Sequence, residues 1–385
     1  MKAMLCREWG APDVLRLEDV SPRAPRPGEV RIRVRAAGVN FADSLMVGGT
    51  YQVKPSFPFT PGLEAAGEVI EIGSGVTGLR PGQRVLAVLR NGGGYAEEIV
   101  LDAATVVPIP EAMDFETAAA FPVAYGTAYF ALTHRGHLQS GETLLVLGAA
   151  GGVGLTAVEI GKALGARVIA AAGGADKLAV AKSRGADELI DYRSESIRDR
   201  VRELTGGNGA DVVYDPVGGD AFDQALRAVN WEARMLVIGF ASGRIQAVPA
   251  NLVLVKNISV IGVVWGAQTE RDPAWMSRNL AELLRWWCQG KLKPLIAKTR
   301  WPRPVRHSMR CYRVATPERW CWRPNQTGSH QSLARLCQFR AECWVGDLDQ
   351  RAGAFGDRAT AHLGNAVLGN DEVGLSARRG DDAIR

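Results

Sequence analysis

A glycine-rich stretch near the middle of the chain constrains its fold most strongly. Residues 148–156 read Gly-Ala-Ala-Gly-Gly-Val-Gly-Leu-Thr, after the apolar run 143–147 and before a segment, 157–164, with helical spacing. This order predicts a strand, a tight turn and a helix, which is the context in which a glycine motif binds a dinucleotide. An ordinary tight turn would not need glycine at four of these positions together.

The individual glycines suggest where the cofactor lies. Glycine at 151 lets the backbone approach a pyrophosphate, and glycine at 154 lets the helix pack closely on its strand. The helix N-terminus presents free N–H groups to the phosphates. We therefore predict a cofactor-binding turn made of Ala149, Ala150, Gly151, Gly152, Val153 and Gly154.

Further apolar runs recur at helix-plus-strand spacing and predict a doubly wound, parallel α/β sheet of the Rossmann type. They lie at residues 166–172, 188–192, 211–215, 235–240 and 258–264. Ligands of such sheets bind at the carboxyl ends of the strands. We therefore expect Tyr192, Val217, Gly239 and Phe240 to line the cofactor cleft, although each alone would be as typical of core or turn packing.

The end of the second strand bears on the choice between NADPH and NADH. NAD-preferring folds place an acidic residue there, about 20 residues past the glycines, to hold the ribose hydroxyls. This chain has Ala172-Gly173-Gly174 instead, with Lys177 one helical turn further on. Because no carboxylate would repel a 2′-phosphate, we predict NADPH, with Gly173 and Lys177 beside that phosphate. Asp176 favours the opposite preference, and Lys177 could equally be a solvated helix residue.

The first 120 residues have a different pattern. Short β runs are separated by Pro-Gly pairs at 27–28, 61–62 and 81–82. Alternation and turns at this spacing predict an all-β, barrel-like domain.

Four segments of the chain carry a family resemblance: residues 37–43, 61–69, 92–97 and 122–129. Together with the glycine turn, they make residues 1 to about 299 resemble the medium-chain dehydrogenase/reductase superfamily. Within it, the chain is most similar to the zinc-free quinone oxidoreductase branch, to which zeta-crystallin belongs. The resemblance implies a GroES-like β-barrel catalytic domain at 1–120, completed by about 266–300, and a Rossmann domain at 121–265. It also implies a homodimer joined through an edge strand near Ser259 to Val264.

The same resemblance speaks against a metal. Zinc-dependent relatives place cysteine and histidine where this chain has Asn40 and Phe41, and histidine where it has Leu63. None of these three is a usable zinc ligand. His134 and His137 are only two, and a site needs three or more ligands. We therefore expect a metal-free enzyme.

The substrate pocket, by resemblance, borders Asn40, Tyr51 and Thr127, which we take as the catalytic residues. Tyr51 offers a phenolic O–H that could stabilise a developing oxyanion, or it could simply pack on the cofactor. Asp43 could cap a helix or touch the ligand.

These features imply an NADPH-dependent oxidoreductase that transfers hydride to a quinone or an activated alkene or enone. One alternative is an enoyl thioester reductase on the same fold. Another is a non-catalytic nucleotide-binding protein with a crystallin-like or RNA-binding role, but residues 1–300 hold 33 Lys and Arg against 32 Asp and Glu, which disfavours strong nucleic-acid binding. Without a signal-peptide pattern or an 18-residue apolar run, the sequence predicts a cytoplasmic protein outside the membrane.

Residues 301–385 break from everything before them. They hold 13 Arg and no Lys, four of the six Cys and four of the ten Trp. They show no sustained periodicity, so we expect an irregular or disordered tail. A genuine cysteine- and arginine-rich module is the alternative, but the cysteine spacing fits neither a zinc site nor a disulfide scaffold.

The codons of this tail indicate a frameshift. Relatives end with an amphipathic helix and a strand that reads roughly Gly-Lys-Val-Val-Leu. Trp320-Cys321-Trp322, read from each codon's third base, must give Val and Leu, and Pro317 to Trp320 permits Gly-Lys-Val before them. The same frame permits a helical apolar face upstream and a stop near Asn325. We infer a frameshift between about Lys298 and Arg306, in the gene or in its determined sequence.

Overall fold

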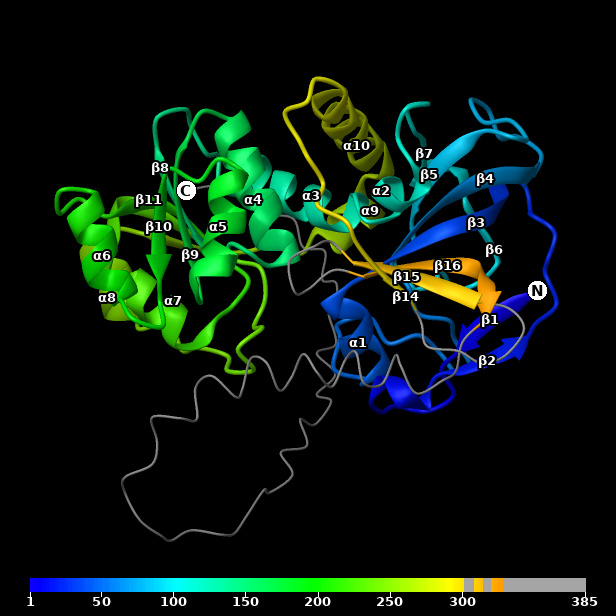
Figure 1. The fold of residues 1–385 in the computed structure, drawn as a ribbon, viewed down its shortest axis with the longest axis horizontal. Coiled ribbons are helices and arrows are strands. Elements are labelled where there is room, and N and C mark those ends of the chain that lie inside the picture. The colour runs from blue at the N-terminus through cyan, green and yellow to red at the C-terminus, as the bar shows by residue number, and fades with distance from the viewer. Residues whose placement is uncertain (301–307, 314–319, 328–385) are drawn as a thin grey trace, which may run out of the picture. The chain divides into compact units, whose positions relative to one another are not determined.

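The computed structural model of this protein describes residues 1–300, 308–313 and 320–327. Six parallel strands form one sheet in the order β10-β9-β8-β11-β12-β13. Their bounds are β8 (Thr143–Leu147), β9 (Arg167–Ala172), β10 (Glu188–Asp191), β11 (Ala210–Asp215), β12 (Val229–Val237) and β13 (Ser259–Gly262). The chain proceeds outward from β8 to β10 and then returns to β11 on the other side of β8, which is the switch point of a doubly wound sheet. The predicted α/β fold is confirmed (Figure 1).

Helices cover both faces of this sheet because its strands are apolar on both faces. Leu144 and Val146 pack in the core beneath α4 (Gly152–Ala163) and α5 (Ala175–Ser183). Leu145 and Leu147 point the other way and pack with α6 (Ile197–Leu204), α7 (Gly219–Leu226) and α8 (Ala250–Lys256).

One strand boundary differs clearly from the predicted run. β12 begins at Val229, well before residue 235, because Val229 pairs with Ala210 of β11. Trp231 and Glu232 follow as exposed residues, and Glu232 has a positive φ of 59°. This irregular start buries no alternating apolar side chains, so no hydrophobic periodicity marks it.

The N-terminal part is antiparallel, as predicted for a β-rich domain. Its elements are β1 (Lys2–Leu5), β2 (Arg16–Asp19), β3 (Glu29–Val39), α1 (Phe41–Val47), β4 (Glu64–Ile72), β5 (Arg84–Val88), β6 (Glu98–Asp102) and β7 (Val106–Pro108), with short 3-10 turns at Pro12–Val14 and Ala103–Thr105. β3 pairs with β4 on one side and with β6 on the other. The glycines of the three Pro-Gly pairs all have φ between 80° and 102°, a conformation that glycine adopts without steric cost.

Two groups of helices join the two sheets. The first comprises α2 (Phe115–Ala119), α3 (Pro122–Tyr129) and a π-helical turn (Phe130–Arg135), and the second comprises α9 (Trp265–Arg271) and α10 (Pro273–Cys288). Their apolar side chains share one core with Leu86 of β5 and Leu144 of β8. This core includes residues on both sides of the predicted domain boundaries at 120 and 265. The boundaries themselves remain a prediction.

Three strands from the C-terminal part of the chain extend the antiparallel sheet beside β3: β14 (Ala297–Arg300), β15 (Ser308–Arg313) and β16 (Trp320–Thr327). The order is β14-β15-β16-β3, and β16 pairs with β3 in the register Trp320↔Val39, Cys321↔Gly38 and Trp322↔Ala37. The sequence did not predict strands in this segment. The rest of the predicted irregular tail lies outside the described residues.

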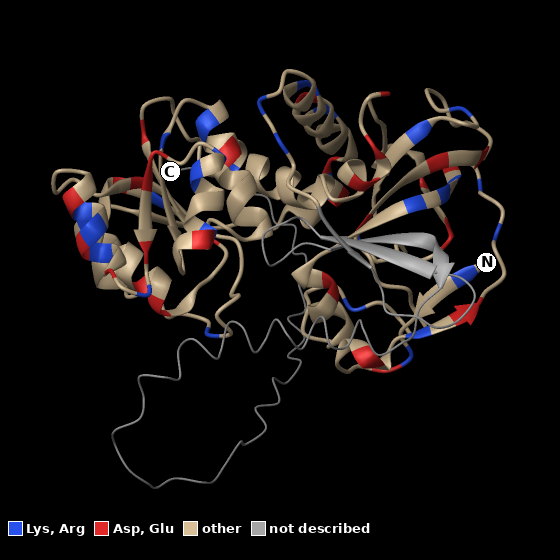
Figure 2. Ribbon diagram, viewed as in Figure 1, with Lys and Arg blue, Asp and Glu red and all other residues tan. Residues whose placement is uncertain are grey.

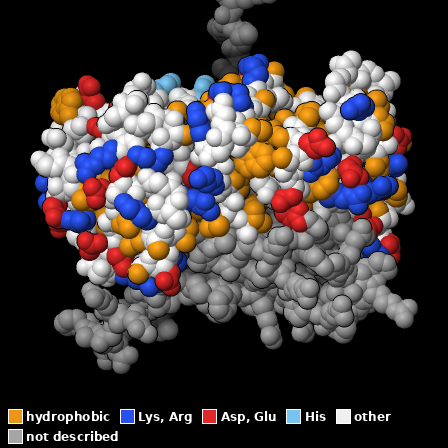
Figure 3. All heavy atoms as spheres, turned by 45° about the horizontal axis from the view of Figure 1, so that its top comes forward, with side chains coloured by type: hydrophobic (Ala, Val, Ile, Leu, Met, Phe, Trp, Pro, Cys, Tyr) orange, Lys and Arg blue, Asp and Glu red, His pale blue; other side chains and the backbone are white. Residues whose placement is uncertain are grey.

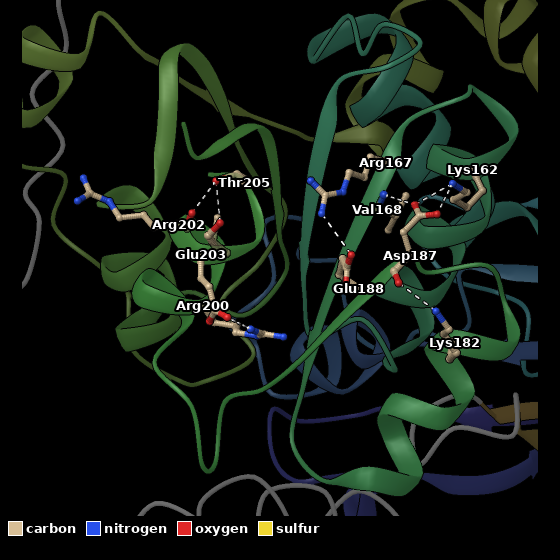
Figure 4. Close-up of polar contacts among 11 residues, drawn as sticks. Lys162, Arg167, Val168, Lys182, Asp187, Glu188, Arg200, Arg202, Glu203 and Thr205 are labelled. Carbon is tan, nitrogen blue, oxygen red and sulfur yellow. Dashed lines mark hydrogen bonds and ion pairs between the residues drawn. The ribbon is translucent and has the colours of Figure 1, made fainter. Parts of the chain in front are cut away.

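Polar contacts fix the amino-terminal edge of the parallel sheet (Figure 4). Both carboxylate oxygens of Asp187 accept hydrogen bonds from Lys162 of α4, at 2.9 and 2.8 Å, and one also accepts the backbone N–H of Val168 at 2.7 Å. Lys182 of α5 donates to the Asp187 carbonyl at 2.9 Å. One aspartate thus ties two helices to two strands, opposite the edge that carries the predicted site.

Candidate cofactor and substrate site

The glycine turn has the backbone that its sequence predicts. Gly148 has φ of 59°, and Gly151 donates to the Gly148 carbonyl at 2.8 Å. A Cβ on Gly154 would lie 2.2 Å from the Gly148 carbonyl oxygen, so only glycine allows α4 to pack this closely on β8. Gly151 is the N-cap of this 12-residue helix, and no side chain caps it. The first N–H groups of α4 are therefore available to a phosphate, as the free donors of a helix N-terminus are.

The other predicted cofactor residues follow strands of the same sheet. Gly173 follows β9, Tyr192 follows β10, Val217 lies just beyond β11, and Gly239 and Phe240 just beyond β12. Since all six strands are parallel, their carboxyl ends meet at one edge. The structure therefore brings these residues to the edge that also carries the glycine turn.

Asp215, the last residue of β11, is a positioning residue that the sequence analysis missed. Its side chain is fully buried, and its Oδ1 accepts the backbone N–H groups of Val217 and Gly218, both at 2.8 Å. Burial raises the pKa of Asp215 to about 6, against the effect of these two hydrogen bonds. The carboxylate fixes the loop on which Val217 reaches the sheet edge. The available sequence signal was an Asp at the end of the apolar run 211–215.

The ends of β9 and β10 together form a basic corner. A Cβ on Gly173 would lie 3.0 Å from Nε of Arg193 and 3.0 Å from the ring of Tyr192, so both side chains lie against this glycine. Asp191 Oδ1 accepts the N–H groups of Gly174 and Arg193, at 3.0 and 3.1 Å, and holds the two loops together. Lys177 lies in the first turn of α5. Arg193 was missed because tertiary folding, not sequence spacing, brings it to Gly173.

The predicted substrate residues come from three elements. Asn40 is the buried N-cap of α1, and its side-chain amide donates to Oε1 of Glu64 at 2.8 Å. Oε2 of Glu64 accepts the N–H of Val123, in the first turn of α3, the helix that carries Thr127. Glu64 therefore connects Asn40 to α3.

Tyr51 lies half-buried after α1, with its N–H donating to Leu45 at 3.1 Å. Burial raises its pKa, the negative charge of Asp43 adds to the shift, and Arg90 opposes it. A tyrosine with a raised pKa keeps its proton and remains a hydrogen-bond donor. Asp43 itself caps α1, since its Oδ2 accepts the Asn40 N–H at 2.7 Å.

The positions at which relatives bind zinc do not offer a donor set here. The Asn40 side-chain amide donates a hydrogen bond to Glu64, Phe41 is apolar and exposed, and Leu63 is buried in the core. Within the part of the chain that the structure describes, no three His, Cys, Asp or Glu side chains are placed to share a metal ion. The ring of His134 stacks on Phe130 at 5.1 Å, which is a packing role.

Comparisons with known proteins place this architecture in a family. Residues 26–111 match the alcohol dehydrogenase GroES-like domain, and residues 152–282 match the zinc-binding dehydrogenase family. The chain is 44% identical to quinone oxidoreductase-like protein 2 homolog of Nematostella vectensis, over 76% of this chain and 80% of that protein.

Two solved structures are similar in fold. Escherichia coli quinone oxidoreductase, solved in complex with NADPH, is 27% identical with a TM-score of 0.73, covering 91% of this chain and 98% of that one. CurK enoyl reductase is 25% identical with a TM-score of 0.73, covering 89% and 96%.

Sheet order, glycine turn and site thus define a medium-chain dehydrogenase/reductase. The chain belongs to the quinone oxidoreductase branch of this superfamily, the branch without zinc. The predicted family is confirmed. The word zinc in one family description does not extend to this chain, because positions 40, 41 and 63 carry no zinc ligands.

Proposed function

We propose that this protein is an NADPH-dependent reductase that transfers hydride to a quinone or an activated alkene or enone without a metal. The observation that carries the proposal is the carboxyl edge of the parallel sheet. The uncapped start of α4 follows β8 there, and the basic corner follows the neighbouring strand β9. The helix start suits a pyrophosphate and the corner of Gly173, Lys177 and Arg193 suits a 2′-phosphate. The NADPH complex of the E. coli relative supports the same cofactor.

In this proposal, bound NADPH supplies the hydride from its nicotinamide, and the protein orients the reactants. Asn40, Tyr51 and Thr127 border the substrate, with Tyr51 donating its O–H to the substrate oxygen. Hydride arrival at the electrophilic carbon leaves negative charge on that oxygen. A donor aimed at such a charge stabilises the transition state by roughly 3 to 4 kcal/mol in known sites.

The test is a panel of quinones, alkenals and enoyl thioesters with NADPH, run with Tyr51→Phe beside the parent chain. We expect turnover of a quinone or enone, and a loss of about 10²- to 10³-fold in kcat for Tyr51→Phe because one oxyanion donor is removed. Tyr129→Phe is the matched control, since Tyr129 packs edge-on against Trp286, outside the site. Turnover of enoyl thioesters alone would favour the enoyl reductase alternative, which the similarity to CurK supports. Unchanged kcat in Tyr51→Phe would remove the proposed role of this hydroxyl.

The charge distribution gives no support to the nucleic-acid alternative. Lys and Arg are interspersed with Asp and Glu over the described ribbon, and the face in Figure 3 mixes both signs with apolar side chains (Figures 2 and 3). A phosphate-binding surface needs a continuous basic stripe. No helix among the described residues has the length and apolar character to cross a bilayer. The cytoplasmic location stays a prediction.

We also propose the homodimer, joined through the free edge of β13. β13 is the last strand in its sheet and pairs only with β12 among the described residues. The Val263 N–H donates to Val237 at 3.0 Å, so by strand alternation the Gly262 N–H points to the open side. An unpaired edge of this kind can pair with a second copy.

Gly262→Pro is expected to convert the dimer to a monomer in light-scattering mass measurements, because proline removes that outward N–H. A Cβ at this position meets no atom within 4 Å, so an added side chain has room there within the subunit. Gly262→Ala keeps the N–H and should remain dimeric. A monomeric parent chain, or a dimer in both variants, would contradict this interface.

A further inference from the structure

The first turn of α9 lies against α3, the helix that carries Thr127. The Trp265 ring is 7% exposed and packs on Gly126, where a Cβ would lie 2.5 Å from the indole. An alanine at this position would displace the indole, so the close contact depends on glycine. Thr269, one helical turn further along, is also buried. Trp265 therefore fixes the start of α9 next to the residue that precedes Thr127.

The other end of α9 meets the loop after β5. Glu270, in the last turn of α9, forms an ion pair with Arg90 of that loop. Burial raises the pKa of Tyr51, and the positive charge of Arg90 opposes this rise, so the guanidinium lies near the phenol. α9 thus extends from the neighbourhood of Thr127 at one end to that of Tyr51 at the other.

Backbone contacts hold Arg90 on this side of the site as well. The N–H of Leu89, the preceding residue, donates to the Leu63 carbonyl at 2.8 Å. Glu64 follows Leu63 as the first residue of β4, and its side chain accepts the Asn40 amide at 2.8 Å. The loop that carries Arg90 is therefore attached beside the residue that holds Asn40.

The two faces of α9 have different surroundings. Residues four apart share a face of a helix, and Trp265 and Thr269 make up the buried face. By the same spacing, Gly266 shares the face of Glu270, which points to Arg90. Gly266 is half-buried, yet a Cβ built on it meets no atom within 4 Å. The face of α9 that is turned to Arg90 is therefore open beside Gly266.

We propose that the Gly266 face of α9 is the outer wall of the substrate pocket, and that this wall selects bulky, uncharged quinones or enones. This assignment rests on the proposed function. The absence of a side chain at Gly266 leaves space for the part of the substrate beyond its reacting carbon. Glu270 neutralises the positive charge that Arg90 brings to this side, so an anionic substituent gains little there. The side chains of Tyr51 and Thr127 are uncharged, which suits the same substrates.

The size of the pocket is tested by Gly266→Leu with phenanthrenequinone and benzoquinone, a bulky and a small uncharged quinone. The ratio of kcat/KM for the bulky quinone to that for the small one should fall by about tenfold or more, because even one methylene group in a pocket changes such a ratio by roughly 10- to 200-fold. Gly266→Ala adds one methyl group and favours the helix, so it should shift the ratio less, in the same direction. Arg271→Leu puts the larger side chain on the exposed end of α9 and, as the matched control, should leave the ratio unchanged.

The charge of this wall is tested by Glu270→Gln with naphthoquinone and naphthoquinone sulfonate, which share one ring system. The parent chain should have the higher kcat/KM for the uncharged quinone. Glu270→Gln removes the carboxylate that pairs with Arg90, so the preference should move toward the sulfonate by about two- to fivefold, the range for a partly exposed charge pair. Glu282→Gln, which breaks an ion pair with Arg285 on α10, is the matched control. An unchanged preference in Glu270→Gln would overturn the selection by charge.

A second readout does not depend on turnover. Phenanthrenequinone binding is measured by calorimetry with NADP⁺ present, because the oxidised cofactor has no hydride to transfer. Gly266→Leu should weaken this binding by about tenfold or more, whereas Arg271→Leu should not. Equal binding by the parent chain and Gly266→Leu, or no binding by the parent, would overturn the wall at Gly266. Weakened binding in Gly266→Leu, with no turnover of any quinone or enone by the parent, would leave the wall in place and remove the proposed function instead.

Discussion

Restoring the reading frame between codons 298 and 306 is expected to give a shorter protein, ending near position 324, that melts cooperatively and turns over NADPH. The strand that the alternative frame encodes, with its forced Val and Leu, falls on residues 320–322. These are the residues at which β16 pairs with Val39, Gly38 and Ala37 of β3. The restored strand would therefore complete the same edge of the antiparallel sheet, with an amphipathic helix before it.

The chain of 385 residues should be less stable than the frame-restored protein. It lacks the apolar face of that helix, and losing several buried side chains at about 1.5 to 3 kcal/mol each is comparable to the whole stability of a typical domain, roughly 5 to 15 kcal/mol. We expect lower yield, a lower melting temperature and proteolysis after about Arg300.

Resequencing the gene tests the frameshift, and the melting temperatures of the two chains test their relative stability. A truncation at Arg300 is the control, because it removes the tail without supplying the strand and should melt no higher than the complete chain. A complete chain that resists protease through residue 385 and melts as high as the restored one would show that the tail is a genuine module.

The second large effect concerns the cofactor. We expect NADPH to bind more tightly than NADH, because Arg193 lies against Gly173, where the 2′-phosphate would lie, and Lys177 lies in the first turn of the helix that follows. Charge-assisted hydrogen bonds are stronger than neutral ones, so Lys177→Glu should weaken NADPH binding by about tenfold or more. Arg193→Glu should act in the same direction. Binding of NADH, which has no 2′-phosphate, should change little in either variant.

Dissociation constants from fluorescence or calorimetry test this prediction without turnover. Arg198→Glu is the matched control, since this exposed arginine of α6 lies outside the basic corner and should leave both constants unchanged. Equal or tighter binding of NADH by the parent chain would reverse the preference and point to Asp176 instead. A loss for NADH as large as that for NADPH would show that the substitution acts through folding.

The cofactor half of the site could be located from the sequence because its signals are local. A glycine motif between a strand and a helix specifies one backbone path, and parallel strands of a doubly wound sheet must end at one edge. Tyr192, Val217 and Gly239 could therefore be placed at that edge without coordinates. The side-chain contacts at that edge could not be predicted from the sequence. Asp215 holds its loop through two backbone N–H groups, and no spacing rule predicts that choice of partner.

The sequence by itself determined the family, the doubly wound sheet, the glycine turn and the loss of zinc ligands, because each depends on residue type within one short segment. Tertiary structure alone decided which distant residues meet. Arg193 reaches Gly173, and Asp43 and Glu64 converge on Asn40, because strands and loops far apart in the chain pack side by side. The pKa of Asp43 depends on that packing, since burial and the nearby Glu64 set it, and neither can be read from a linear chain.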